Sequence, residues 1–416
     1  MLDIPGVPVV TMYRLICFTL LIAVITHGVK SILGWIRSAP LAKPMVALFI
    51  FGIISAIINM GSEDSGFLAA FNILVEIVTP VFTFCYYFSK INGAKQQEIC
   101  RKLIIFYGLI AIYGTFAYFI EFNPYIEFLD STSKTGRILT RTYEGTLRGL
   151  RAQGTISHPI TFGGALVIIL ASVSSISAAG RKLGKNPLSG AFPLISVGMI
   201  LVVLILTKSR TPLVDLLVAI FLSLSLSSIK FSGKYIIIGV FVVSVTFFNV
   251  PAFQDAVFSV ANIFDSSIGE DQNGSSLEMR SGQFNAAMNY FADDFTTVIF
   301  GNGMSATRNI IASEADIALY NAESLVFTVM IDQGLSGLFV YAWVFFQSII
   351  LAFKYIEDRS SRSILLGAIV GYLVFVVSTG IQETLSLFLA LYSMVVLRWQ
   401  TYYREGGDAR RRCSRV

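Results

Sequence analysis

Arg210 is the side chain whose position most clearly suggests chemistry. It lies in the short turn Thr-Lys-Ser-Arg-Thr-Pro at residues 207–212, between two apolar runs. A cation that two membrane spans hold at the surface is well placed to bind an anion. Arginine suits phosphate because its planar guanidinium binds two oxygens at once. We therefore predict that Arg210 binds a phosphate-bearing ligand.

A second group of basic residues precedes another apolar run. Arg148 and Arg151 come shortly before His158 and Pro159, and Ser157 and Pro159 are typical of a helix start. A helix N-terminus that points out of the membrane, with two arginines upstream, favours phosphate. For His158 three roles are open: a catalytic base, a donor to phosphate, or the cap of the helix, of which capping is the most frequent.

Membrane helices must position these residues. The 416 residues are 55% hydrophobic and 14% charged, whereas soluble domains carry about 25% charged residues. Apolar runs recur that are long enough to cross a hydrocarbon core roughly 30 Å thick. They are unbroken rather than alternating, which indicates helices and not a barrel. The expected fold is an all-α polytopic membrane protein, with residues 1–416 forming a single integral membrane domain.

The number of spans follows from the same runs. We expect about eleven transmembrane helices, within a range of roughly ten to thirteen. They are predicted near residues 12–28, 44–60, 66–88, 103–122, 160–179, 191–207, 211–227, 234–250, 322–353, 363–379 and 384–399.

Lysine and arginine are distributed unevenly over the connecting loops. Most of the 31 lie in one alternate set, so the positive-inside rule places that set in the cytoplasm. The Arg210 turn then faces outward, and an odd span count puts the N-terminus outside. The basic loops are residues 29–44, 89–102, 180–187, 228–234, 354–363 and the tail from Arg398.

The cysteine spacing and the net charge argue against several kinds of site. The four cysteines have neither metal-ligand nor disulfide-framework spacing, so they are expected to be small apolar fillers. The net charge of +5 is spread over membrane loops and predicts no nucleic-acid partner.

Two long external loops are expected to carry function, residues 123–159 and 251–321. The second should be partly helical, over residues 277–295, with an apolar side. Such a helix lies on the membrane surface, caps a cavity, or packs against the rest of its loop. The apolar side comprises Leu277, Phe284, Met288 and Phe291.

The span at residues 322–353 is longer than a bilayer requires, about 48 Å as one helix. Either its first turns project outward or it breaks near residues 332–334. We expect projection, because Asn321, Glu323 and Asp332 would be costly inside lipid.

Four segments in order carry a family resemblance. They are Arg-Ala-Gln-Gly-Thr-Ile-Ser-His-Pro at 151–159, Leu-Thr-Lys-Ser-Arg-Thr-Pro at 206–212, Glu-Met-Arg-Ser-Gly-Gln-Phe at 278–284 and Phe-Gly-Asn-Gly at 300–303. Together they resemble the bacterial O-antigen polymerase and O-antigen ligase family. That family combines a short T-x-S-R turn with a large periplasmic loop that ends in G-x-G. The motifs cover roughly residues 148–340, and the span pattern covers the whole chain.

The resemblance implies a glycosyltransferase of the bacterial inner membrane whose active site faces the periplasm. Its donor is a glycan on undecaprenyl pyrophosphate, the lipid pyrophosphate is the leaving group, and no nucleotide sugar, metal or other cofactor is needed. The pyrophosphate-binding role carries over to Arg210 and Arg280, and more weakly to Arg151 with Arg148 beside it. A protein acts in such chemistry mainly by stabilising the charge on the departing group.

One departure from the family concerns the catalytic base. Ligases of the family tend to carry a His-Asn pair after the large loop, but residues 319–324 read Leu-Tyr-Asn-Ala-Glu-Ser. Glu323 is the candidate base, with Tyr320 and His158 as further candidates. Tyrosine is a poor base at neutral pH, and Glu323 is equally suited to complement a helix dipole. The missing histidine favours a polymerase.

Three functions therefore remain. The leading one is a polymerase that joins lipid-linked oligosaccharide repeat units in polysaccharide or lipopolysaccharide biosynthesis, with the bilayer and a chain-length regulator as candidate partners. The second is an O-antigen ligase that transfers glycan to lipid A core or to a protein. The third is a polysaccharide transporter or flippase, for which midspan acids such as Glu76 and Asp215 are the signal.

Overall fold

A computed structural model gives the structure of the protein and divides it into two compact units. The first comprises Met1–Gln96, Met279–Ile356 and Val376–Val416, and the second comprises Gln97–Glu278 and Glu357–Phe375. All regular elements in the described part of the chain are helices. The structure describes residues 12–26, 34, 36, 39–60, 66–132, 151–156, 158–180, 186–227, 277–313, 319, 324–379 and 383–413.

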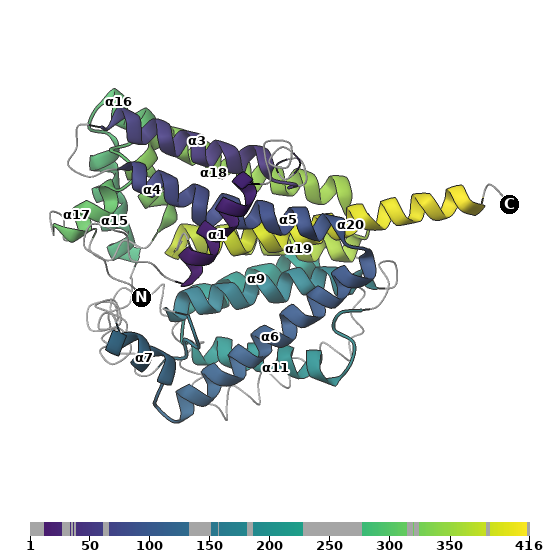
Figure 1. The fold of residues 1–416 in the computed structure, drawn as a ribbon. Helices are drawn as coiled ribbons and strands as arrows, with labels where there is room; N and C mark the ends of the chain where they lie inside the picture. The colour runs from purple at the N-terminus through teal and green to yellow at the C-terminus, as the bar shows by residue number, and fades with distance from the viewer. Residues whose placement is uncertain are drawn as a thin grey trace. The chain divides into compact units, whose positions relative to one another are not determined.

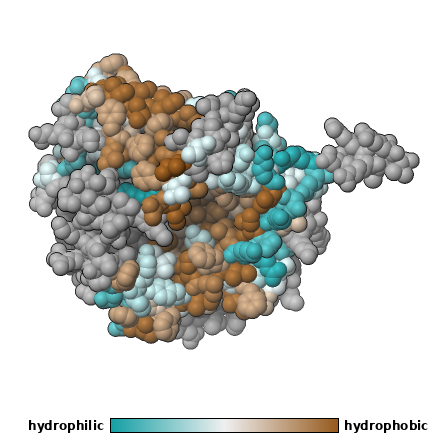
Figure 2. All heavy atoms as spheres, in the orientation of Figure 1, coloured by the Kyte–Doolittle hydropathy of each residue, from teal (hydrophilic) through white to brown (hydrophobic). Residues whose placement is uncertain are grey.

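The first unit is a bundle of apolar helices with short helices from the large loop. Helix α3 packs along α18, α5 packs along α20, and α16 packs against α18 (Figure 1). Hydrophobic side chains cover the outward side of α3, and hydrophilic ones gather where α5 ends and α20 leaves the bundle (Figure 2). The helices are α1 (Met12–Thr26), α3 (Ala42–Ile58), α4 (Gly66–Asn72), the π-helix η1 (Ile73–Val78), α5 (Thr79–Lys90), α15 (Leu277–Phe291), α16 (Phe295–Phe300), α17 (Ala306–Ala312), α18 (Leu325–Tyr355) and α20 (Glu383–Cys413).

Helices α4, η1 and α5 form one continuous span with a wider turn in its middle. Pro80 near the start of α5 has no N–H and cannot complete a regular helical turn. The π-helical turn before it accommodates this, and the Thr79 hydroxyl donates to the Leu74 carbonyl at 2.8 Å.

Helix α18 is interrupted at Gly334, whose φ of 61° and ψ of −153° are not helical. The break lies where one was considered from the sequence, so the expectation of an unbroken helix was wrong, and outward projection of its first turns stays a prediction. Glycine has no Cβ and adopts this backbone conformation at little cost. The break frees backbone carbonyls that a membrane protein must satisfy internally.

The second unit is arranged around α9, whose side chains are almost all buried. Gly163 and Gly164 allow neighbours to approach: an added Cβ would lie 2.7 Å from Pro212 and 2.6 Å from Phe375. Its helices are most of α6 (Gly93–Phe119), α7 (Pro124–Thr132), α9 (Pro159–Ala178), α11 (Ala191–Leu206), α12 (Arg210–Leu226) and most of α19 (Arg359–Thr379).

Helix α6 presents an exposed apolar row at helical spacing, as expected of a helix that faces lipid. The row consists of Phe106, Leu109, Ile112, Phe116 and Phe119.

Five helices of the described part are long and apolar enough to cross a membrane, and α3 and α11 are shorter apolar helices. The protein is thus a multi-pass, all-α membrane protein, as the sequence indicated. The total of about eleven spans stays a prediction, as does the single domain, and the span expected at 234–250 lies outside the described residues. The five are Gly66–Lys90, Gly93–Phe119, Pro159–Ala178, Leu325–Tyr355 and Arg359–Thr379.

Candidate active site

Arg210 is the first residue of α12, and only three residues separate it from the end of α11. The turn is tight: Lys208 has a φ of 47°, and the Thr207 hydroxyl donates to the Leu204 carbonyl at 2.7 Å. Ser209 is buried, and the Lys208 ammonium lies 5.8 Å from the ring centre of Tyr118. The Arg210 side chain thus starts from a rigid backbone at a helix N-terminus, where the helix dipole favours anions.

The Arg151 side chain is hydrogen-bonded to this same turn. Its Nε donates to the Thr207 carbonyl at 2.9 Å and its Nη2 donates to Ser209 Oγ at 2.6 Å. The backbone N–H of Ala152 donates to the Leu206 carbonyl at 2.9 Å. The sequence predicted Arg151 as a ligand of pyrophosphate, but these bonds give the buried side chain a second role, which is to position the turn that carries Arg210.

Asn123 holds the segment after Arg151, and sequence reasoning missed it. Its Nδ2 donates to the Gly154 carbonyl at 3.0 Å, and its Oδ1 accepts from the Tyr113 hydroxyl at 2.7 Å. The same oxygen accepts from the N–H of Ile126 at the start of α7. An asparagine directly before Pro124 is a recognisable helix-cap signal, although its long-range bond to Gly154 had no sequence signature.

His158 caps α9, which confirms the most frequent of its three expected roles. Its Nδ1 accepts from the N–H of Ile160 at 3.3 Å. Burial, with the nearby Arg151 charge as a smaller cause, lowers the pKa of His158 to about 4. The neutral ring then carries its proton on Nε2, because Nδ1 already accepts. His158 is therefore suited to donate a hydrogen bond and not to remove a proton.

The G-x-G segment, residues 301–303, is bonded to the break in α18 within the first unit. The N–H of Asn302 donates to the Ile331 carbonyl at 2.7 Å, and the N–H of Gly303 donates to the Asp332 carbonyl at 3.2 Å. An added Cβ on Gly301 would collide with the backbone of Asp332. The loop thus satisfies the carbonyls that the break frees, and the approach requires glycine.

Asp332 is buried and hydrogen-bonded inside the protein. Its Oδ1 accepts from both the N–H and the hydroxyl of Thr307, each at 2.7 Å. The Ser55 hydroxyl donates to its carbonyl at 2.8 Å. An acid satisfied in this way costs less free energy when it is buried than an unpaired one, so its presence alone does not require the helix to project.

Helix α15 packs against its own loop and α18, which is one of the three expected arrangements. Phe284 of its predicted apolar side lies 6.1 Å from Phe327 of α18, ring centre to ring centre. Its buried residues include Gln283, Ala286 and Ala287, whereas Phe284 is 46% exposed. Ala286 and Ala287 form a cluster with Leu319 and Ile331. Small residues permit close backbone approach here, and that packing determined the buried side more than the large apolar residues did.

Several predicted site residues lie beyond what the structure describes. Arg148, Tyr320 and Glu323 are outside the described residues, and Arg280 is placed only as part of the backbone of α15. Arg210 and Arg280 belong to different units. Their convergence on one ligand therefore stays a prediction.

Among the described residues, no group of three or more His, Cys, Asp or Glu side chains is placed to hold a metal ion. Cys17, Cys85 and Cys100 are buried thiols, consistent with the expected filler role.

The fold and the turn define a helical multi-pass membrane protein with an arginine fixed at the junction of helices α11 and α12. Residues 195–342 match the family model described as O-antigen ligase. This match supports the resemblance to the O-antigen ligase and polymerase family that the four motifs indicated. The matched segment includes Arg210, Arg280 and the G-x-G residues. No curated protein matches the chain.

Proposed function

We propose that this protein polymerises undecaprenyl-pyrophosphate-linked repeat units at the periplasmic face of the inner membrane. A hydroxyl of the acceptor unit attacks the anomeric carbon of the growing chain. The new glycosidic C–O bond forms as the bond to the pyrophosphate oxygen breaks. The hydroxyl proton passes to a base, and undecaprenyl pyrophosphate leaves.

The observation that carries this proposal is the turn that bears Arg210. Arg151 supports its backbone from a distant segment, and Arg210 begins α12 directly after it. Negative charge grows on the departing pyrophosphate during the reaction. A preorganised cation and a helix N-terminus stabilise that charge without reorganising.

The other roles follow the sequence prediction. Arg280 and Arg148 add cations for the pyrophosphate, and Glu323 takes the acceptor proton, with Tyr320 as a weaker candidate. His158 contributes a hydrogen bond from Nε2 and not a base, because its pKa lies near 4. Glu323→Gln should abolish turnover if Glu323 is the base. Near-normal turnover of that variant would leave Glu323 with only a helix-dipole role.

The second candidate is an O-antigen ligase that transfers glycan to lipid A core or to a protein. The description of the matching family favours it. The absence of histidine from residues 319–324 favours the polymerase.

A transport function loses part of its support. Glu76, one of the two midspan acids that suggested it, forms an ion pair with Arg14 at 2.6 Å. An acid already paired within the first unit gives no reason to invoke a substrate pathway.

A deletion strain separates the candidates. Loss of a polymerase leaves single repeat units on the cell surface, whereas loss of a ligase leaves long lipid-linked polymer, and both are visible as band patterns on a gel. Purified protein in liposomes adds a direct measurement: release of undecaprenyl pyrophosphate from lipid-linked repeat units. Movement of the lipid-linked unit without any release would support transport instead.

A further inference from the structure

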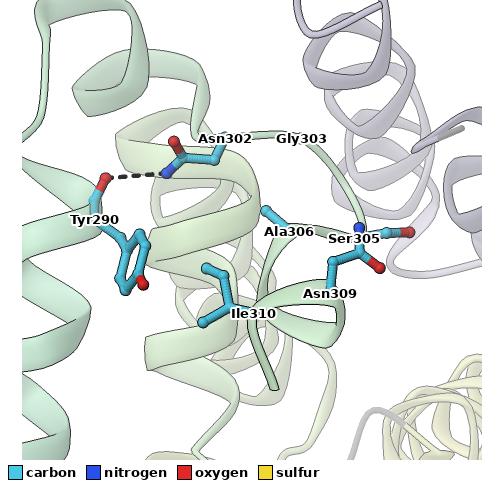
Figure 3. Close-up of a pocket in the computed structure, with 7 residues that line it drawn as sticks. All are labelled: Tyr290, Asn302, Gly303, Ser305, Ala306, Asn309 and Ile310. Atoms are coloured by element: carbon cyan, nitrogen blue, oxygen red, sulfur yellow. Dashed lines mark hydrogen bonds between the residues drawn. The ribbon is translucent and has the colours of Figure 1, made fainter. Parts of the chain in front are cut away.

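A cavity of about 300 Å³ lies beside the G-x-G loop in the first unit. Tyr290 of α15 stands on one side, and Ala306 and Ile310 of α17 stand on the other (Figure 3). It is lined by Tyr290, Asn302, Gly303, Ser305, Ala306, Asn309 and Ile310.

The lining is mostly apolar, with a few polar groups and no charged side chain. Ser305 and Asn309 offer a hydroxyl and an amide, and Tyr290 offers an aromatic ring with a hydroxyl. Apolar surface with a few placed polar groups is the usual make-up of a small-molecule site. A pyrophosphate would require cations here, whereas a neutral sugar has both hydroxyl groups and an apolar ring face.

The walls of the cavity are fixed to each other. The Asn302 amide donates to the Tyr290 carbonyl at 3.0 Å and to the Ile331 carbonyl at 3.3 Å, which joins α15 to the break in α18. Asp332 holds the start of α17 through Thr307. A site whose walls are preorganised loses less free energy when it orders a ligand.

Two residues of the cavity also pack near Leu319, which is close in sequence to the proposed base. Tyr290 and Ile310 pack against a buried cluster that includes Leu319 and Ile331. Leu319 lies shortly before Glu323 in the chain. In the proposed reaction Glu323 acts on the acceptor hydroxyl.

From these observations we infer that the cavity binds one neutral sugar residue of the acceptor repeat unit. Its volume is at the lower end for ligand pockets, which range over roughly 300–1,000 Å³, so it suits one sugar and not a longer oligosaccharide. This inference rests on the proposed function. The Asn309 amide and the Tyr290 ring are the groups that recognise the sugar, while Asn302 is a positioning residue.

Saturation-transfer NMR on the full-length protein in nanodiscs tests the site without requiring turnover. The probes are the methyl glycosides of glucose, galactose, mannose, rhamnose and N-acetylglucosamine. At least one should bind the wild type, and Asn309→Ala should weaken its binding by about tenfold, as expected for one lost hydrogen bond. Tyr290→Phe keeps the ring and should have a smaller effect. Asn285→Ala, an exposed amide on α15, is the matched control and should change nothing.

The inference is overturned if none of the five glycosides binds, or if Asn309→Ala and Asn285→Ala behave alike. A liposome assay keeps this outcome distinct from failure of the proposed function. Polymerisation by the wild type with an unchanged acceptor KM in Asn309→Ala removes the sugar site alone. Specific sugar binding without any release of undecaprenyl pyrophosphate removes the polymerase and leaves the site.

Discussion

At the scale of residues, the guanidinium of Arg210 differs from an ammonium in ways that the proposed ligand would detect. A guanidinium presents parallel N–H groups to two phosphate oxygens, whereas lysine presents a point charge on a flexible stem. Arg210 follows a turn whose backbone is bonded to Arg151, so its Cα is held in place. A substitution by lysine therefore removes the planar guanidinium and leaves the backbone position unchanged.

Arg210→Lys should therefore lower the polymerisation rate by about a hundredfold, in the range seen when one preorganised charge-stabilising donor is removed. Membrane insertion and expression should stay normal, because the charge is kept. Chain-length analysis by gel and release of undecaprenyl pyrophosphate provide the measurement. Arg308→Lys is the matched control, since Arg308 is exposed on α17. Wild-type polymer length in Arg210→Lys would remove the phosphate role.

His158 provides a prediction about pH. Its folded-state pKa of about 4 lies below the ordinary value of 6.5, so the unfolded chain binds more protons between those two values. The free energy of unfolding should accordingly fall as the pH drops through that window and stay level above it. His158→Asn keeps a capping side chain that also carries an N–H donor. It should reduce this acid sensitivity and, since it removes no catalytic base, should lose only a small part of the activity near pH 7. Thermal unfolding in detergent from pH 4 to 8 measures the first effect, and loss of turnover in His158→Asn would instead point to a catalytic imidazole.

At the scale of elements, the break in α18 and the G-x-G loop depend on each other. An added Cβ on Gly334 would lie 2.7 Å from the backbone nitrogen of Gly301, and Gly301 itself has a φ of 74°. The loop satisfies the backbone groups that the break exposes, and the break provides the surface on which the loop lies. We therefore expect neither the loop nor the break to be stable without the other. This mutual dependence explains why a polar loop is fixed against an apolar helix.

Gly301→Ala should destabilise the first unit by about 1–3 kcal/mol, because it forces a strained backbone and a steric collision. The thermal midpoint in nanodiscs should fall. Gly282→Ala in α15 is the control, since an added Cβ there meets nothing within 4 Å, and a helical glycine-to-alanine change is neutral or slightly stabilising. Equal midpoints for the two variants would contradict the interdependence of loop and break.

The sequence could predict these elements only where residues close together in the chain determine them. Long apolar runs located the helices because hydropathy and length act within a segment, and Gly334 lay inside the stretch where a break was considered. The partners of Asp332 could not be predicted, because Thr307 and Ser55 are distant in the chain and carry no shared motif. Likewise, the buried side of α15 is determined by close packing of Ala286 and Ala287, which large apolar residues do not indicate.

At the scale of the whole molecule, the predicted membrane orientation bears on the proposed reaction. The positive-inside rule predicts that the Arg210 turn and the large loop lie on the same face of the membrane. Arg210 belongs to the second unit, and the loop from Met279 onward belongs to the first. A reaction that uses Arg210 of the turn and Arg280 of the loop requires that the turn and the loop lie on the same face of the membrane. Thiol labelling is suited to test this, since Cys17, Cys85 and Cys100 are buried and should not react in the folded protein.

Two variants, each with one added cysteine in a Cys413→Ser background, make the orientation measurable. Arg308→Cys places an exposed thiol on α17, and Glu357→Cys places one in the turn between α18 and α19. In spheroplasts a membrane-impermeant maleimide should label Arg308→Cys at once and Glu357→Cys only after permeabilisation. The reverse pattern would put the large loop in the cytoplasm, where a periplasmic reaction is impossible. Labelling of both from outside would mean that α18 does not span the membrane. The hydrogen bonds at its break could then not be explained by the need of a transmembrane helix to satisfy its backbone groups inside the protein.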